Sequence, residues 1–88
     1  MFIVVSYDIS SERSRSRARI ICGKYLQHIQ KSVFEGEISE KKLCVLKEKL
    51  KAVVDPEADS AVICRFDLPG VPQRERIGRI RADEDEFI

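Results

Sequence analysis

The N-terminal segment Phe2–Ile9 is the feature that most restricts the fold, because it is apolar on both sides through Val5. Successive side chains of a strand point to opposite faces, so Phe2 and Val4 share one face and Ile3 and Val5 share the other. A strand with two apolar faces is typical of the centre of a sheet that is covered on both sides. We therefore expect this segment to be a central strand whose two faces both need a covering layer.

Two later segments carry apolar side chains at the spacing of helices that face a core. The first is predicted to begin after a serine N-cap, Ser10 or Ser11, and to end near Tyr25. The second is predicted to begin after the N-cap Ser39 and to run from residue 40 to about Val54, where an Asp-Pro pair ends it. The chain thus offers two helices to cover a sheet.

The remaining elements are predicted to be strands. Apolar positions change parity between residues 26 and 38, which one regular strand cannot do, so we expect a bend, a bulge or two short strands there. Residues 61–66 read as a further strand, and a loop and a charged tail follow over 67–88. The pattern predicts a single α+β domain over residues 1–88 with its core in 1–66. Because two helices cover only one face of such a sheet, a second copy is expected to cover the other face, sheet against sheet.

The composition is that of a globular protein rather than a disordered chain. The 88 residues are 43% hydrophobic and 35% charged. No apolar run approaches the roughly 18 residues of a membrane helix, and the first residues lack the features of a signal peptide. We therefore expect a cytoplasmic protein with no membrane partner. Cys22, Cys44 and Cys64 lack zinc-site spacing and are expected to be buried, reduced thiols.

The first third of the chain is basic although the net charge is only +1. Residues 1–31 hold six Lys and Arg against two acids, a local balance of +4. Arginine binds phosphate through paired hydrogen bonds and stays charged. The cluster therefore indicates a phosphate-bearing partner, with a solvated helix face as the alternative. Its members are Arg13, Arg15, Arg17 and Arg19.

Asp8 is the candidate for chemistry, because it is a carboxylate at the end of the predicted central strand, where α/β sheets bind ligands. A hydrolytic metal site normally needs two or more carboxylates. The other acids, Asp59 among them, are expected at other ends of the elements, so a two-fold axis beside the strand end would have to supply a second Asp8. The alternative is that Asp8 only accepts hydrogen bonds within the turn. His28 is interpreted as a partly exposed residue at a strand entry, with a general base as the alternative.

Two motifs together resemble a known family. Residues 4–10 read VVSYDIS and residues 29–38 read IQKSVFEGEI, with the arginine-rich helix between them. This combination resembles the small CRISPR-associated protein of the spacer-acquisition module, the family called CRISPR-associated endoribonuclease and the partner of the CRISPR integrase. The similarity covers residues 1–66, and the tail is similar only in kind. This chain has His28 where the family often has Arg or Lys.

The resemblance implies a ferredoxin-like βαββαβ sandwich that forms a homodimer with facing sheets, with the C-terminal strand added to the partner's sheet. It implies that Asp8 of each chain is a catalytic residue and binds Mg²⁺ (or Mn²⁺), and that Tyr7 is catalytic. It further implies nucleic-acid contacts for Arg15, Arg17 and Phe34. These implications extend the phosphate partner predicted from the arginine cluster to DNA or RNA.

Three functions are compatible with these features. The first is a metal-dependent endonuclease of CRISPR adaptation that hydrolyses phosphodiester bonds of single-stranded RNA or double-stranded DNA. The second is a non-catalytic homodimeric scaffold that bridges the CRISPR integrase in a heterohexamer-type complex and binds protospacer DNA through the arginine helix. The third is a toxin-like ribonuclease of the same fold. The sequence does not rank the first two.

Overall fold

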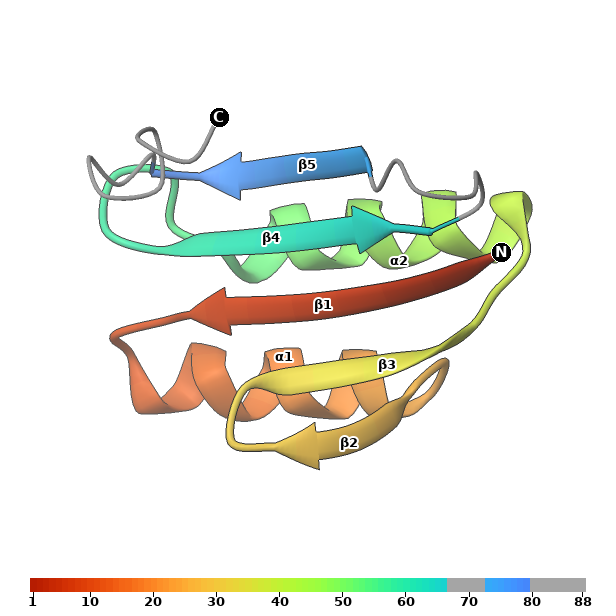
Figure 1. Ribbon diagram of the computed structural model, residues 1–88. Helices are drawn as coiled ribbons and strands as arrows, with labels where there is room; N and C mark the ends of the chain where they lie inside the picture. Colours follow the sequence, from red (N-terminus) through yellow and green to blue (C-terminus); the bar gives the residue numbers. More distant parts are fainter. Residues whose placement is uncertain (67–72, 80–88) are drawn as a thin grey trace.

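The fold is a five-stranded antiparallel sheet with two helices on one side (Figure 1). The computed structural model describes residues 1–66 and 73–79. In chain order the elements are β1 Phe2–Asp8, α1 Glu12–Gly23, β2 Gln27–Gln30, β3 Val33–Glu37, α2 Glu40–Val53, β4 Ser60–Arg65 and β5 Gln73–Gly78. The strand order β2-β3-β1-β4-β5 places β1 in the middle of the sheet. The α+β class and the central position of the first strand are therefore confirmed.

Serine N-caps determine where both helices begin. The Oγ atom of Ser11 accepts a hydrogen bond from the N–H of Ser14 at 3.3 Å, and Ser39 Oγ accepts one from the N–H of Lys42 at 3.2 Å. These bonds satisfy N–H groups that lack partners in the first turn of a helix. Helix α1 ends at Gly23, slightly earlier than predicted, and α2 ends at its predicted boundary within one residue. Neither helix of the described residues is long and apolar enough to cross a membrane.

The change of parity between residues 26 and 38 results from two short strands. β2 and β3 pair antiparallel, with a register shift between His28 and Gln30. Lys31 in the connecting turn has a φ of 36°, in the left-handed region that few L-residues adopt. The turn lies beside the end of β1, where the N–H of Tyr7 donates to the carbonyl oxygen of Ser32 at 3.2 Å. The hairpin thus carries Lys31 and Ser32 to the same end of the sheet as Tyr7.

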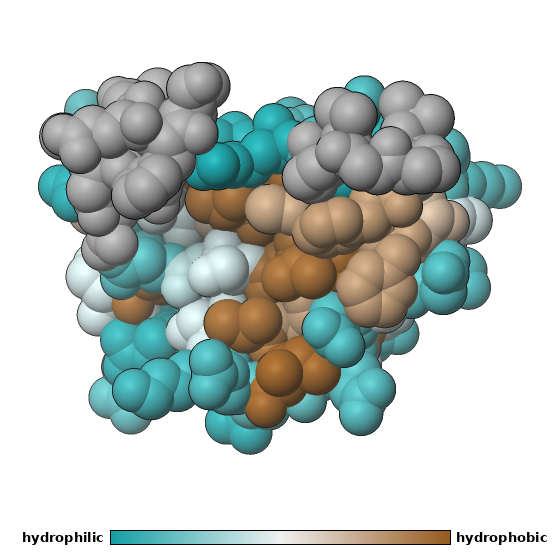
Figure 2. Space-filling model, viewed as in Figure 1, coloured by the Kyte–Doolittle hydropathy of each residue, from teal (hydrophilic) through white to brown (hydrophobic). Residues whose placement is uncertain are grey.

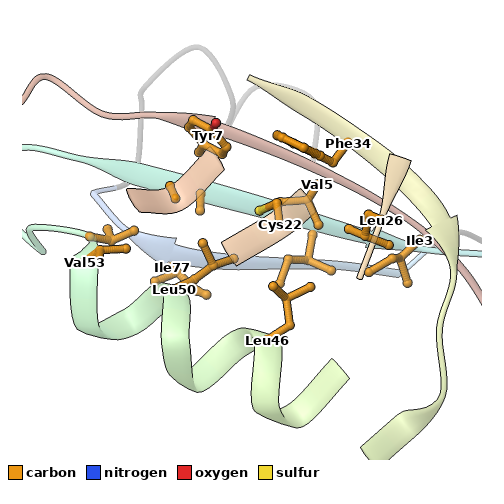
Figure 3. Packing of buried hydrophobic residues seen from close by; sticks show 14 of the residues in the cluster. Ile3, Val5, Tyr7, Cys22, Leu26, Phe34, Leu46, Leu50, Val53 and Ile77 are labelled. Atoms are coloured by element: carbon orange, nitrogen blue, oxygen red, sulfur yellow. The ribbon is translucent and has the colours of Figure 1, made fainter. Parts of the chain in front are cut away.

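The core fills the space between the sheet and the helices (Figure 3). Ile3, Val5 and Tyr7 of β1 point to the helices and are at most 6% exposed. They meet fully or almost fully buried residues of the helices, namely Ala18, Cys22, Leu43, Leu46 and Leu50. Each buried aliphatic side chain of this size contributes about 1.5–3 kcal/mol relative to an exposed one. This packing fixes which side chains of β1 are left to face the other way.

Neither α1 nor α2, the helices of the described residues, lies on the opposite side of the sheet (Figure 1). Even-numbered residues of β1 point there, together with their partners across β3 and β4. Figure 2 shows apolar side chains gathered on this side, over the middle of the sheet. We call this surface the open sheet face. Its apolar residues are Phe2, Val4, Val33, Val62, Cys64 and Phe66.

The last described strand joins the sheet of its own chain. The resemblance implies that the C-terminal strand adds to a partner's sheet, but β5 pairs with β4, in register from Ser60 opposite Gly78 to Arg65 opposite Gln73. The edge of β4 presents unpaired backbone groups, and the short connection over residues 67–72 lets β5 reach them at a small entropic cost. Residues 73–78 thus pair within the sheet of their own chain, and the addition of a C-terminal strand to a partner's sheet stays a prediction. The rest of the predicted pairing tail, 80–88, lies outside the described residues.

Candidate nucleic-acid interface

Asp8 lies at the end of β1 and on the open sheet face. It has the same parity as Phe2 and Val4, and it stands opposite Ser60 in the antiparallel pairing with β4. Its side chain is exposed. The carboxylate therefore stands at the border of an uncovered apolar surface, where it can meet groups from a molecule that docks on that surface.

Asp59 lies at the same end of the sheet as Asp8, contrary to the expectation from the sequence. The reason is that β4 runs antiparallel to β1, so the residue before β4 adjoins the residues after β1. The Asp59 carboxylate accepts hydrogen bonds from Ser10 N–H at 3.0 Å, from Ser10 Oγ at 3.1 Å and from Asp55 N–H at 3.0 Å. Burial acts to raise the pKa of Asp59, but these hydrogen bonds outweigh it and hold the pKa below its usual value. Asp59 thus holds the turn that follows Asp8.

One chain does not complete a metal site from the residues described. Among residues 1–66 and 73–79, no group of three or more His, Cys, Asp or Glu side chains is placed to hold an ion. Mg²⁺ prefers oxygen ligands, and it often binds through one or two carboxylates while keeping several waters. The exposed carboxylate of Asp8 fits this role when a second carboxylate faces it.

The arginines of α1 are exposed, but they do not all have the same surroundings. Arg15 also supports the fold, since its Nη1 atom donates to the carbonyl oxygens of Ile9 at 3.0 Å and Ser10 at 3.3 Å. Its guanidinium is therefore fixed beside the turn between β1 and α1. Arg13 and Arg17 lie one helical turn apart on a different flank. The helix thus presents positive charge in two directions.

Tyr7 lies on the other side of β1 from Asp8 and points toward the helices (Figure 3). It borders a pocket of about 360 Å³. Burial raises the pKa of Tyr7, and the neighbouring Cys22 acts in the same direction, while the positive charge of Arg19 acts against both. The hydroxyl therefore remains protonated at neutral pH and can donate a hydrogen bond. The other residues that line the pocket are Arg15, Ser16, Arg19, Lys31 and Ser32.

Phe34 has a packing role and not the expected contact with nucleic acid. Its side chain is 1% exposed, because it stands opposite Val5 on the helix-covered face of the sheet. Its ring stacks on Tyr7 with centroids 6.2 Å apart and lies against His28 with centroids 4.7 Å apart. His28 is exposed at the entry of β2, as predicted, and its Nε2 donates to the carbonyl oxygen of Lys31 at 2.7 Å. The rings of Phe34 and His28 therefore support the turn at Lys31 and the pocket beside Tyr7.

Three residues of the pocket were not identified from the sequence. Ser16 lies next to Arg15 and one turn before Arg19, so helical spacing from the arginines is a signal that could have identified it. Lys31 and Ser32 reach the pocket only because the β2–β3 hairpin turns beside β1. No local pattern in the sequence encodes that proximity.

Comparison with known proteins places the chain in a family. Residues 1–81 match the family described as CRISPR associated protein Cas2. A protein of Fusobacterium nucleatum named CRISPR-associated endoribonuclease Cas2 is 37% identical over 92 residues, covering 100% of this chain and 87% of that protein. A protein of the same name from Pyrococcus furiosus is 35% identical over 88 residues and 100% of both chains.

Solved structures give the same result. A crystal structure of Cas2 superposes with a TM-score of 0.68 at 34% identity, covering 93% of this chain and 91% of the other. The crystal structure of Streptococcus pyogenes Cas2 at pH 6.5 gives a TM-score of 0.65 at 29% identity, covering 80% of this chain and 87% of the other. The family match and the shared fold confirm the resemblance seen in the two sequence motifs. The chain belongs to the CRISPR-associated Cas2 family.

Proposed function

We propose that this protein acts in CRISPR adaptation as a homodimer, and that its two Asp8 carboxylates bind one divalent metal ion to hydrolyse phosphodiester bonds of RNA or DNA. The observation that carries the proposal is the position of Asp8 at the end of the open sheet face. The names of the two relatives as endoribonucleases support the same reaction class.

The apolar character of the open sheet face favours a second copy as its cover. Phe2 and Phe66 form a cluster on it, with ring centroids 6.4 Å apart, and Phe66 is 47% exposed. Two sheets that pack face to face bury such side chains between them. A two-fold axis through that contact places identical residues near one another, including the two copies of Asp8 when the axis passes close to the strand ends.

Asp8 would hold Mg²⁺ or Mn²⁺ through a carboxylate oxygen from each chain. Such an ion, when bound, neutralises charge on a phosphate and lowers the pKa of a bound water. The chain's own residues supply binding and orientation. The exposed arginines Arg13 and Arg17 attract the phosphates of the substrate, while the hydrogen bonds of Asp59 and Arg15 keep the turn after Asp8 in place.

A non-catalytic scaffold is the second candidate. It is favoured by the four exposed arginines on α1, because arginines can bind phosphates without any help from a carboxylate. In that role the dimer binds protospacer DNA through its phosphates and bridges the CRISPR integrase, and Asp8 contributes no chemistry.

Substitution of Asp8 by asparagine separates the two candidates. Asp8→Asn removes one charge from each chain, and we expect loss of Mg²⁺-dependent cleavage with retention of the fold. Asp55→Asn is the matched control, because Asp55 is exposed and accepts one hydrogen bond within its own turn, from Glu57 N–H. Cleavage and spacer integration are both measured. Equal cleavage by wild type and Asp8→Asn refutes the metal site. Loss of cleavage with intact spacer integration shows that the dimer supports integration as a scaffold, without the chemistry of Asp8.

The dimer is tested separately. Phe66→Asp places a charge on the open sheet face, and Ile20→Asp places one on the exposed surface of α1, where Ile20 is 62% exposed. We expect sedimentation equilibrium to show a dimer for wild type and Ile20→Asp and a monomer for Phe66→Asp. A wild type that sediments as a monomer at micromolar concentration contradicts the proposal.

A further inference from the structure

The pocket beside Tyr7 is separate from the proposed metal site. It opens on the helix side of β1, whereas Asp8 lies on the open sheet face. Its walls come from β1, from α1 and from the β2–β3 turn, and its volume is about 360 Å³. The pocket is therefore assembled by three elements that are far apart in the sequence.

The lining of this pocket is strongly positive. Arg15, Arg19 and Lys31 supply three cationic groups, and none of the described residues that line the pocket is acidic. The hydroxyls of Tyr7, Ser16 and Ser32 add neutral hydrogen-bond donors. Cationic groups combined with hydroxyl donors are the chemistry that binds an anion with several oxygens, such as phosphate.

Two of the walls are held rigidly. Arg15 is fixed by its hydrogen bonds to the carbonyl oxygens of Ile9 and Ser10. The backbone of the turn at Lys31 is held by the hydrogen bond from His28 Nε2 to the Lys31 carbonyl oxygen. A pocket whose walls are fixed in advance loses less entropy when a ligand binds. This preorganisation distinguishes the pocket from the solvated flank that carries Arg13 and Arg17.

We propose that this pocket binds a phosphomonoester, the terminal phosphate of a nucleic-acid strand or of a free nucleotide. The inference rests on the proposed function only in so far as the protein binds nucleic acid. A phosphomonoester carries about −1.5 to −2 charges near pH 7, whereas a backbone phosphodiester carries one, so three cationic groups favour the monoester. A strand end can also enter a recess that a continuous backbone can only pass over.

The test compares one single-stranded oligonucleotide with a 5′-phosphate, with a 3′-phosphate and with hydroxyls at both ends. Affinities are measured by fluorescence anisotropy without divalent ions, so that no cleavage occurs. We expect the wild type to bind one phosphorylated form at least about tenfold more tightly, as for one added charge-assisted hydrogen bond. Adenosine monophosphate should compete with that form, whereas adenosine should not. Competition without any end preference assigns the pocket to a free nucleotide.

Variants locate the preference. The quantity compared is the ratio of the affinity for the preferred phosphorylated oligonucleotide to the affinity for the one with hydroxyls at both ends. Arg19→Ala and Lys31→Ala change exposed residues and should bring this ratio close to one. Tyr7→Phe keeps the ring packed on Phe34 and should lower the ratio. Arg17→Ala is the matched control on the same helix, and it should weaken all the oligonucleotides alike without changing the ratio. The proposal is overturned if the wild type binds all three oligonucleotides equally and adenosine monophosphate does not compete. It is also overturned if Arg17→Ala changes the affinity ratio as much as Arg19→Ala does. Asp8→Asn should keep the ratio, so failure of the metal site and failure of the pocket are distinguishable.

Discussion

Replacement of Asp59 by asparagine tests how the turn after Asp8 is held. The wild-type carboxylate accepts three hydrogen bonds, two from Ser10 and one from the N–H of Asp55, and the residue is 3% exposed. An asparagine side chain has one oxygen, so it cannot accept on both sides. Whichever way the amide lies, a partly buried donor of Ser10 or Asp55 faces an NH₂ group.

The magnitude follows from these contacts. A buried donor left without an acceptor costs about 1–3 kcal/mol, and the bonds that remain are weaker because the acceptor is no longer charged. We expect Asp59→Asn to lower the free energy of unfolding at pH 7 by about 2–3 kcal/mol. For a domain of this size that corresponds to a fall in Tm of roughly 10–20 °C.

The effect should depend on pH because the pKa of Asp59 is held below its usual value. The unfolded carboxyl binds a proton near pH 3.9, whereas the folded one remains ionised to lower pH. The stability that Asp59 contributes is therefore present above about pH 4 and is lost as the pH falls through the folded pKa. The difference between wild type and variant should narrow in acid.

Urea unfolding at fixed protein concentration, at pH 7 and at pH 3, measures both effects. Asp55→Asn is the control, because its exposed carboxylate accepts a single local hydrogen bond. A loss of stability for Asp59→Asn no larger than that of the control refutes the reasoning. So does a loss that stays the same between the two pH values.

Salt dependence, backbone strain and thiol reactivity give three further predictions. The double variant Arg13→Ala, Arg17→Ala should show a shallower slope of log K, the binding constant for duplex DNA, against log salt. The slope should change by roughly 0.9 for each phosphate that the variant no longer neutralises. The control Lys51→Ala removes a lysine paired with Glu48 at 3.4 Å and should leave the slope unchanged. Gly78→Ala should destabilise the fold by more than about 2 kcal/mol in urea unfolding, because Gly78 has a φ of +91° and the new Cβ would lie 2.3 Å from the carbonyl oxygen of Asp59. The control Gly23→Ala should not destabilise the fold, because a Cβ added at Gly23 meets nothing within 4 Å. The expectation that the three cysteines are buried holds for Cys22 but is wrong for Cys44, which is exposed, and for Cys64, which is half-buried. Cys44 should therefore react with a thiol reagent at pH 8, whereas Cys22, whose pKa burial raises to about 12, should react only after unfolding. Equal reaction rates of Cys44 and Cys22 in the folded protein would contradict this.

Local patterns were sufficient to predict most of the fold. The apolar segment at Phe2–Ile9 identified β1 as the central strand. Serines also marked the starts of both helices: Ser39 for α2, and Ser10 or Ser11 for α1, where the structure shows Ser11 as the cap. These features are encoded in side-chain periodicity and capping, which act over a few residues. The strand that β5 joins could not be predicted in the same way, because pairing with β4 depends on a free sheet edge and not on the sequence of β5 alone.

The candidate site was predictable only in part. The exposed carboxylate of Asp8 and the arginines of α1 follow from strand and helix spacing. Tyr7 and Asp8 point to opposite faces of the sheet, as the two-residue period of a strand requires. The resemblance to the family had implied a catalytic role for both residues. The approach of Lys31 to Tyr7 and of Asp59 to Ser10 depends on tertiary pairing across many residues. Long-range contacts of this kind have no signature in a single sequence.

The most direct test of the shared metal site is the stoichiometry of Mn²⁺ binding, measured by isothermal titration calorimetry on the metal-free protein. Because one Asp8 from each chain is proposed to bind a single ion, we predict one ion for every two chains. Asp8→Asn should show no binding at this site, and Asp55→Asn should bind as the wild type does. Binding of one ion per chain, or equal binding by wild type and Asp8→Asn, would contradict a metal site shared between two copies of Asp8.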